Sequence, residues 1–141
     1  MTLNLEDRTE LIKYRMQQAT ECIDEVLFLI NNNKYKISVN RIYYGMFYSL
    51  LALGLKDQYE SSKHAQLIGW FNKNYIHTGL IDVKFGKMIN KAFTLRNESD
   101  YEPFIEYEEQ EVSELYDKMK EFIKTVHEIL FQDNNTKPAS L

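Results

Sequence analysis

The sequence predicts an all-α protein: a five-helix, largely antiparallel bundle. Three observations lead to this prediction. Apolar residues recur every three to four positions in several segments, which is typical of helices with one buried face. The alternation of polar and β-branched residues expected of half-buried strands is absent. Both prolines, Pro103 and Pro138, lie late in the chain, so no proline interrupts a helix before residue 103.

The most apolar stretch, residues 39–55, is expected to form the central helix. Its apolar residues cover every side, and such a helix must be surrounded by other helices or by lipid. Its 17 residues fall short of the roughly 20 apolar residues that a bilayer span needs. One narrow strip of small and polar residues recurs at helical spacing. This strip is either a close contact between helices or the floor of a polar site, and it comprises Arg41, Gly45, Ser49 and Ala52.

The first two helices are expected to pair. The first should span residues 5–30, with Asn4 as its N-cap and one apolar stripe at 3.6-residue spacing. Three asparagines at 31–33 should end it, because asparagine competes for backbone hydrogen bonds and tolerates left-handed geometry. The second helix, residues 36–54, follows a short connection, so the two should lie antiparallel.

The third and fourth helices are shorter. The third is expected over residues 63–75, with Ser61 or Ser62 as its N-cap. The fourth should begin after Asp82 as N-cap and fray near Ser99, because the coming proline disfavours helix just before it.

The fifth helix is expected over residues 107–131, where a long apolar stripe resumes. No interdomain linker or internal repeat appears, so residues 5–131 should form a single domain. The polar stretch at 132–141 is expected to be a disordered tail.

Composition limits the class of protein. Hydrophobic residues make up 44% and aromatic residues 13% of the 141 residues, so a sizeable core is expected and global disorder is excluded. The single cysteine cannot form an internal disulfide, which fits a reducing compartment. The first residues are polar and acidic, unlike a secretory signal. We therefore expect a cytoplasmic protein that does not enter the membrane.

Charge is unevenly distributed. Residues 34–91 hold nine Lys/Arg and three acids, whereas residues 98–121 hold ten acids and two Lys. The net charge of −4 argues against sequence-independent nucleic-acid binding over the whole surface, because such affinity comes from neutralised phosphates. A local basic cleft stays compatible with this total. The acidic run is most simply a solvated helix face.

Common catalytic and cofactor motifs are absent. The three histidines, at 64, 77 and 127, have neither the Glu-x-x-His nor the His-x-x-x-His spacing of metal-binding helices. No glycine-rich phosphate loop occurs. We therefore expect no metal and no cofactor.

Arg96 is the most informative polar residue. It falls on the apolar stripe of the fourth helix, and Asp100 lies four positions on, on the same helix face. One interpretation is a structural ion pair between them, with Tyr101 closing the core. The other is an arginine positioned to hold a phosphate, because guanidinium is always charged and forks onto anions. Arg41 raises the same question on the central helix, and His64 is an exposed residue, a core residue or a general base.

Three segments resemble motifs of the HEPN family of small prokaryotic proteins. The family's RxYYAMF helix is similar to VNRIYYGMFYSLLALGL at 39–55. Its Ser-His segment before the third helix is similar to SSKHAQLIGWF at 61–71. The Arg-x-x-x-Asp-Tyr end of its fourth helix is similar to LRNESDYEP at 95–103. The matches come in the family's order, and with the helices between them they cover roughly residues 5–131.

The resemblance implies an all-α bundle, usually a homodimer, with the fourth-helix arginines of two subunits facing one cleft. Many members are metal-independent ribonucleases or toxins, often restrained by a small nucleotidyltransferase. Their catalytic signature is an arginine followed, after four to six residues, by histidine. Arg96 matches the arginine, but residues 101–103 are Tyr, Glu and Pro. Tyrosine titrates near 10, so it is a poor base at pH 7, and the sequence leans away from an enzyme.

Three hypotheses follow. The first is a nucleotide- or RNA-associated binding module that acts with a nucleotidyltransferase in a toxin–antitoxin or defence-like pair. The second is an active ribonuclease, in which Arg96 stabilises phosphate charge and His64 or Tyr101 transfers protons. In some relatives the partner adenylylates a tyrosine near the motif, and Tyr101 is the candidate here. The third is a structural dimer without a small ligand. The binding cleft of the first would comprise Arg41, Arg96, Asp100 and Tyr101.

Overall fold

The computed structural model describes residues 3–132, and it confirms an all-α bundle of five helices. No strand occurs within that range. The tail predicted at 132–141 lies, from residue 133 on, outside the described residues. The elements are α1 (Leu5–Asn31), α2 (Tyr35–Lys56), α3 (His64–Phe71), the π-helical turn η1 (Asn72–Ile76), α4 (Val83–Tyr101) and α5 (Glu109–Phe131).

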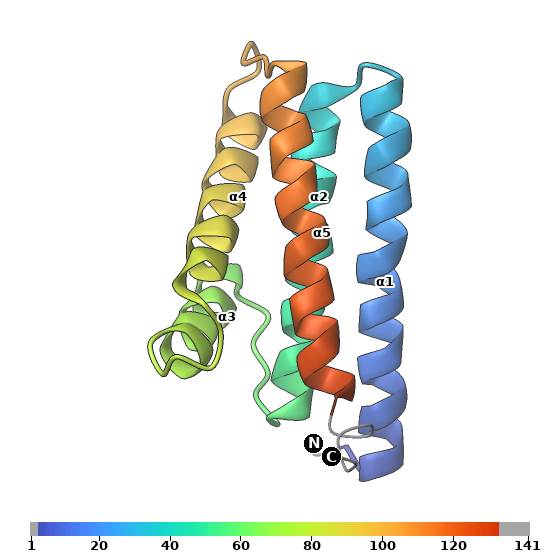
Figure 1. Ribbon diagram of the computed structural model, residues 1–141, viewed down its shortest axis with the longest axis vertical. Helices are drawn as coiled ribbons and strands as arrows, with labels where there is room; N and C mark the ends of the chain where they lie inside the picture. The colour runs from blue at the N-terminus through green and yellow to red at the C-terminus, as the bar shows by residue number, and fades with distance from the viewer. Residues whose placement is uncertain (1–2, 133–141) are drawn as a thin grey trace.

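The four long helices run side by side, and the chain reverses direction between α1 and α2 and again between α4 and α5 (Figure 1). The pair α1–α2 is therefore antiparallel, as predicted. The pair α4–α5 is antiparallel too, whereas α2 and α5 run in the same direction. The short α3 lies to one side of the lower part of the bundle, below α4, and contacts α2 and α4 (Figure 1).

Helix α2 forms the centre of the bundle. It contacts α1, α3, α4 and α5. Tyr43, Met46, Leu50 and Leu53 are all fully buried. The apolar coat of residues 39–55 is thus explained by surrounding helices. Between residues 3 and 132, no helix combines the length and the apolar character needed to cross a bilayer.

The strip of small residues on α2 is a close helix contact. A Cβ added at Gly45 would lie 2.9 Å from Met119 Sδ on α5 and 3.1 Å from Cys22 Cβ on α1. Glycine therefore lets three helices approach one another. Ser49, one turn on, is buried and donates a 2.6 Å hydrogen bond to the carbonyl of Met46.

Two of the predicted N-caps are confirmed and one is wrong. The Asn4 side chain accepts a 2.7 Å bond from Asp7 N, and Asp82 accepts a 2.9 Å bond from Lys84 N. Helix α3 instead has Lys63 as its N-cap, without a side-chain bond. Neither Ser61 nor Ser62 is the cap, because both precede Lys63, and the Ser61 hydroxyl accepts a 3.1 Å bond from the N–H of Lys63 itself.

Three predicted helix ends are shifted. The third helix becomes a π-helical turn after Phe71 and ends at Ile76. Helix α4 continues past Ser99 to Tyr101, and Ser99 helps to close this last turn by donating a 3.0 Å bond to the carbonyl of Arg96. Helix α5 begins at Glu109 rather than at residue 107. Tyr107 instead lies against α4, where its hydroxyl donates a 3.2 Å hydrogen bond to the carbonyl of Leu95.

Candidate functional site

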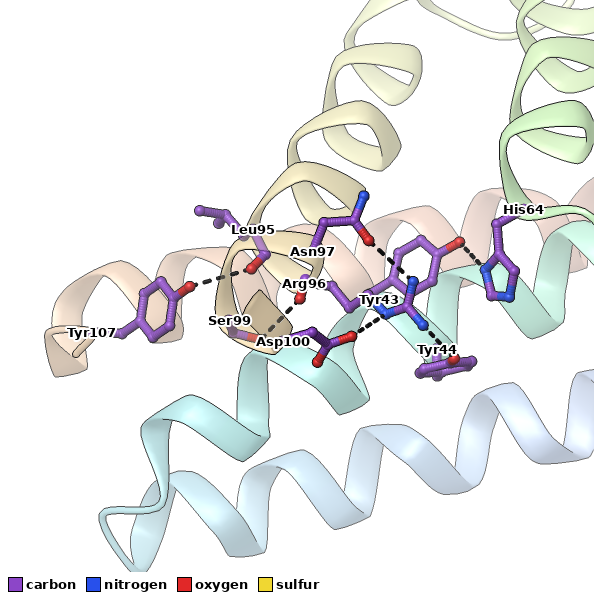
Figure 2. Close-up of polar contacts among 9 residues, drawn as sticks. All are labelled: Tyr43, Tyr44, His64, Leu95, Arg96, Asn97, Ser99, Asp100 and Tyr107. Carbon is purple, nitrogen blue, oxygen red and sulfur yellow. Dashed lines mark hydrogen bonds and ion pairs between the residues drawn. The ribbon is translucent and has the colours of Figure 1, made fainter. Parts of the chain in front are cut away.

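Arg96 on α4 reaches across to α2 and is held by three partners (Figure 2). Its Nη2 donates a 2.9 Å bond to Tyr44 Oη, and its Nη1 donates a 3.1 Å bond to Asn97 Oδ1. Its Nε lies 3.1 Å from Asp100 Oδ2 in an ion pair, with a side-chain exposure of 20% for Arg96 and 40% for Asp100. The predicted pairing of Arg96 with Asp100 is therefore present, but Asp100 is only one of three partners.

The Arg96 guanidinium retains unused hydrogen-bonding capacity. Its Nε is buried, and despite the ion pair its N–H is not aligned with the Asp100 carboxylate well enough for a hydrogen bond. Two of the five N–H donors of arginine are used in the bonds to Tyr44 and Asn97. The buried Nε cannot reach a ligand, so the donors left for an anion are the second N–H of Nη1 and of Nη2, which form no hydrogen bond among residues 3–132.

Two tyrosines of α2 form a platform for this guanidinium. Its carbon lies 5.5 Å from the ring centroid of Tyr43 and 5.4 Å from that of Tyr44. Both distances are within the range of cation–π attraction. The guanidinium is thus fixed in place by rings as well as by hydrogen bonds.

His64, the first residue of α3, belongs to the same cluster. Its Nδ1 lies 2.7 Å from Tyr43 Oη, and its ring stacks on Phe47 with centroids 4.1 Å apart and planes 7° apart. Burial, and secondly the positive charge of Arg96, lower the pKa of His64 below its ordinary 6.5. His64 is therefore mainly neutral at pH 7.

The tautomer of His64 follows from Tyr43. Burial raises the pKa of Tyr43, so its hydroxyl stays protonated. In the described part of the chain the only acceptor bonded to this hydroxyl is His64 Nδ1. If Tyr43 donates to Nδ1, the proton of the neutral imidazole is on Nε2. No hydrogen bond is formed by Nε2 among residues 3–132, so it can donate to a ligand.

Arg41 lies on the Tyr44 ring as well, with its guanidinium carbon 5.6 Å from the ring centroid. Its fork turns toward α1, where Nη2 is 3.5 Å from both Glu25 Oε1 and Cys22 Sγ. Burial raises the pKa of Cys22 to about 11, so this partner is a neutral thiol. Both arginines thus contact Tyr44, whose ring also meets His64 edge-on, but only Arg96 also contacts Tyr43, the hydrogen-bond partner of His64.

Sequence comparison identifies the protein family. The HEPN domain model matches residues 12–129. The chain belongs to the HEPN family. It is 31% identical over 126 residues to a "UPF0332 protein" of Thermotoga maritima, covering 89% of this chain and 96% of the relative.

Two relatives from Methanocaldococcus jannaschii carry a functional name. "Putative toxin MJ0142" is 31% identical over 135 residues, which is 96% of this HEPN chain and 91% of the relative. "Putative toxin MJ0605" is 30% identical over 126 residues, 85% of this chain and 94% of the relative.

Tyr101 lies apart from the Arg96 cluster of this HEPN chain. It is the last residue of α4 and is 82% exposed, so the interpretation in which it closes the core is wrong. The cause is that α4 continues to Tyr101 and turns this side chain outward. Its predicted roles in ligand binding and modification stay predictions.

Sequence analysis missed Tyr43, Tyr44 and Asn97 as site residues. Both tyrosines belong to the apolar coat of α2, and their spacing alone does not separate a core ring from a site ring. The available signal was chemical, because a tyrosine on a buried surface needs a partner for its hydroxyl. No group of three or more His, Cys, Asp or Glu side chains is arranged to hold a metal within the described residues of this HEPN chain.

Proposed function

We propose that this HEPN chain is a toxin-type module that binds single-stranded RNA, with Arg96 as the contact to a backbone phosphate. One observation carries the proposal: the guanidinium is held on two tyrosine rings while part of its donor fork remains unbonded. Arginine forms bidentate, charge-assisted bonds with phosphate. A pre-positioned fork loses less conformational freedom on binding than a mobile one.

His64 and Asp100 complete the proposed site. The free Nε2–H of His64 is a second donor next to the arginine. The pairing with Asp100 sets the orientation of Arg96 without fully neutralising it, because the carboxylate is partly exposed to water. Arg41 adds positive charge beside Tyr44, but its partners on α1 make it a supporting residue. In this proposal Tyr101 extends the cleft toward a second subunit.

The toxin assignment rests on the names of the two archaeal relatives. We include in the proposal the homodimer and the small nucleotidyltransferase partner that the family resemblance implies. Residues 5–131 would act as one domain in the cytoplasm, where both RNA and such a partner are found.

A metal-independent ribonuclease is the second candidate, and the placement of His64 beside Arg96 favours it. The inferred tautomer leaves Nε2 protonated, however, so His64 is arranged to donate a hydrogen bond rather than to remove a proton. Binding therefore fits the geometry better than cleavage. The structural hypothesis is weaker, because it makes Arg96–Asp100 a core ion pair, whereas the Asp100 side chain is 40% exposed.

Binding is tested with a short, fluorescently labelled single-stranded RNA of mixed sequence and the full chain. We expect Arg96→Ala to weaken binding at least ten-fold, since hydrogen bonds to charged groups contribute about 1.5–3 kcal/mol each. Arg8→Ala, on α1 and outside the cluster, is the matched control. Equal affinity of the wild type, Arg96→Ala and Arg8→Ala would contradict the proposal.

The same RNA, incubated with the protein in EDTA, separates binding from cleavage. Intact RNA after prolonged incubation supports the binding module. Cleavage that disappears in both Arg96→Ala and His64→Asn would instead establish the ribonuclease. Cleavage that persists in both variants would indicate a contaminating enzyme.

A further inference from the structure

A second concave site lies on the same face of α2 as Tyr44. Positions 44, 47, 51 and 55 follow one another at three- and four-residue spacing, so they share one side of the helix. Tyr44 bonds Arg96, whereas the next three residues along this face line a pocket of about 450 Å³. From Tyr44 to Leu51 the helix rises about 10 Å. The pocket is thus next to the Arg96 cluster.

Phe47 is the residue common to both sites. One side of its ring stacks on His64, and the residue also lines the pocket. The chain also connects the two sites in sequence. Ser61 and Ser62 line the pocket, and the next two residues are Lys63 and His64. A molecule that contacts His64 can therefore continue into the pocket along Phe47.

The lining of the pocket suits a flat, partly polar ring. Its floor is apolar, and Phe47 and Tyr59 supply aromatic surface. Tyr59 is held in place because it stacks on Trp70, with centroids 4.9 Å apart and planes 4° apart. Small-molecule pockets typically have volumes of about 300–1,000 Å³ and combine apolar walls with a few polar groups. The pocket is lined by Leu11, Arg15, Phe47, Leu51, Leu55, Tyr59, Glu60, Ser61, Ser62 and Leu67.

The rim of the pocket offers both donors and acceptors. Arg15 uses Nη1 to bond Gln18 at 2.9 Å, which leaves its other donors available. Glu60 supplies a carboxylate, and the Ser62 hydroxyl forms no hydrogen bond among residues 3–132. A nucleobase presents donors and acceptors on its edge and an apolar face, so both kinds of lining would be used.

We propose that this pocket holds one unstacked base of the RNA whose phosphate contacts Arg96. The proposal rests on the proposed function and specifies where the base adjacent to that phosphate binds. Single-stranded RNA is commonly recognised by bases that splay out and stack on aromatic side chains. The opposite charges of Arg15 and Glu60 disfavour a purely apolar ligand such as a lipid chain.

The test uses a set of single-stranded RNAs that are identical except for one abasic position, which is moved along the strand. The wild-type protein should bind one of these RNAs about ten-fold more weakly than the intact strand, the loss expected for one stacked base. Leu11 lies half-buried on α1 and lines the pocket, so the larger side chain of Leu11→Trp should fill it. This variant should bind the intact strand more weakly by a similar factor. It should leave the affinity for that one abasic strand unchanged.

Leu5→Trp is the matched control, because Leu5 lies on the same helix, is 69% exposed and does not line the pocket. It should bind every RNA of the set like the wild type. Circular dichroism and thermal melting of both tryptophan variants verify the fold.

The outcomes distinguish the two proposals. Binding that depends on Arg96 but is equal for all abasic strands, or is unaffected by Leu11→Trp, would overturn the base pocket alone. Binding that does not depend on Arg96 would overturn the proposed function, and the base pocket with it.

Discussion

Arg96 shows how a helix position with an apolar pattern can carry a charge. Two rings, a hydroxyl, an amide and a carboxylate surround its guanidinium. Each contact replaces part of the lost hydration, so the charge is tolerated at the edge of the core. The same contacts fix the direction of the fork, which is what recognition of a phosphate requires.

Replacing Arg96 by lysine separates charge from geometry. Lysine keeps the positive charge but lacks the planar fork. We expect Arg96→Lys to lose about ten-fold in RNA affinity, close to one lost charge-assisted hydrogen bond. Fluorescence anisotropy measures this, with Arg8→Lys as control. Affinity equal to that of the wild type would mean that only net charge matters at this position.

His64 predicts a pH dependence of folding stability. Its pKa is lowered in the folded state, so between that value and about 6.5 the unfolded chain binds more protons than the native one. The free energy of unfolding should therefore fall as the pH drops below about 6.5. Urea unfolding between pH 7.5 and pH 5 measures this, and His64→Asn should flatten the curve.

The control for this experiment is His77→Asn, because His77 is exposed and outside the cluster. It should retain the wild-type pH dependence. If His64→Asn and the wild type lose stability in parallel between pH 7.5 and pH 5, the effect arises from other groups.

Helix α2 depends on close approach at Gly45. Alanine there would press against Cys22 Cβ, which cannot move without its helix, and against Met119 Sδ. We expect Gly45→Ala to lower the free energy of unfolding by about 1–3 kcal/mol, the usual cost of overpacking. Guanidinium unfolding measures the change.

Gly69 provides the comparison for Gly45. It is helical too, but a Cβ added there would have no atom within 4 Å. Gly69→Ala should therefore raise stability by up to about 1 kcal/mol, through helix propensity alone. A stabilising effect of both substitutions would show that the three helices have room to separate at Gly45.

Helices were predictable because their signals are local. The apolar stripes at 3.6-residue spacing determine where most helices lie. The N-caps Asn4 and Asp82 determine where two of them begin, and each of these signals acts within a few residues. The π-helical turn after Phe71 was not predictable, since a π-turn depends on how the helix packs. Its neighbour Gly86 shows this, because a Cβ there would lie 2.8 Å from Asn72 Oδ1.

The candidate site was predictable only in part, for the same reason. Asp100 follows Arg96 by four residues, so helical periodicity alone places them together. The bond from Arg96 to Tyr44 joins residues 52 positions apart, and no periodicity relates them. His64 was a candidate because of the motif that precedes α3, but its contact with Tyr43 is tertiary.

At the scale of the molecule, the exposed aromatic residues beyond Asp100 suggest where two copies meet. Tyr101, the last residue of α4, is 82% exposed, and Phe104, in the loop that follows α4, is 93% exposed. We expect a homodimer by sedimentation equilibrium, with twice the mass of the chain, and Phe104→Glu should convert it to monomer. Such a charge would be buried without a partner in the interface.

Phe28→Glu is the control for the dimer experiment. Phe28 is 66% exposed on α1 and borders a separate apolar groove near Ile37. If Phe28→Glu dissociates the dimer and Phe104→Glu does not, the subunits pair through the α1–α2 hairpin. Two Arg96 residues would then not face one cleft.

The close packing around Gly45 also buries a thiol whose reaction rate can report on opening of the bundle. Cys22 is the single thiol of the chain, is 1% exposed, and has its pKa raised to about 11 by burial. Alkylating reagents attack thiolates, so the native thiol should react very slowly at pH 8. The rate of labelling, followed by mass spectrometry without any mutation, would then report how often α1 detaches from the bundle.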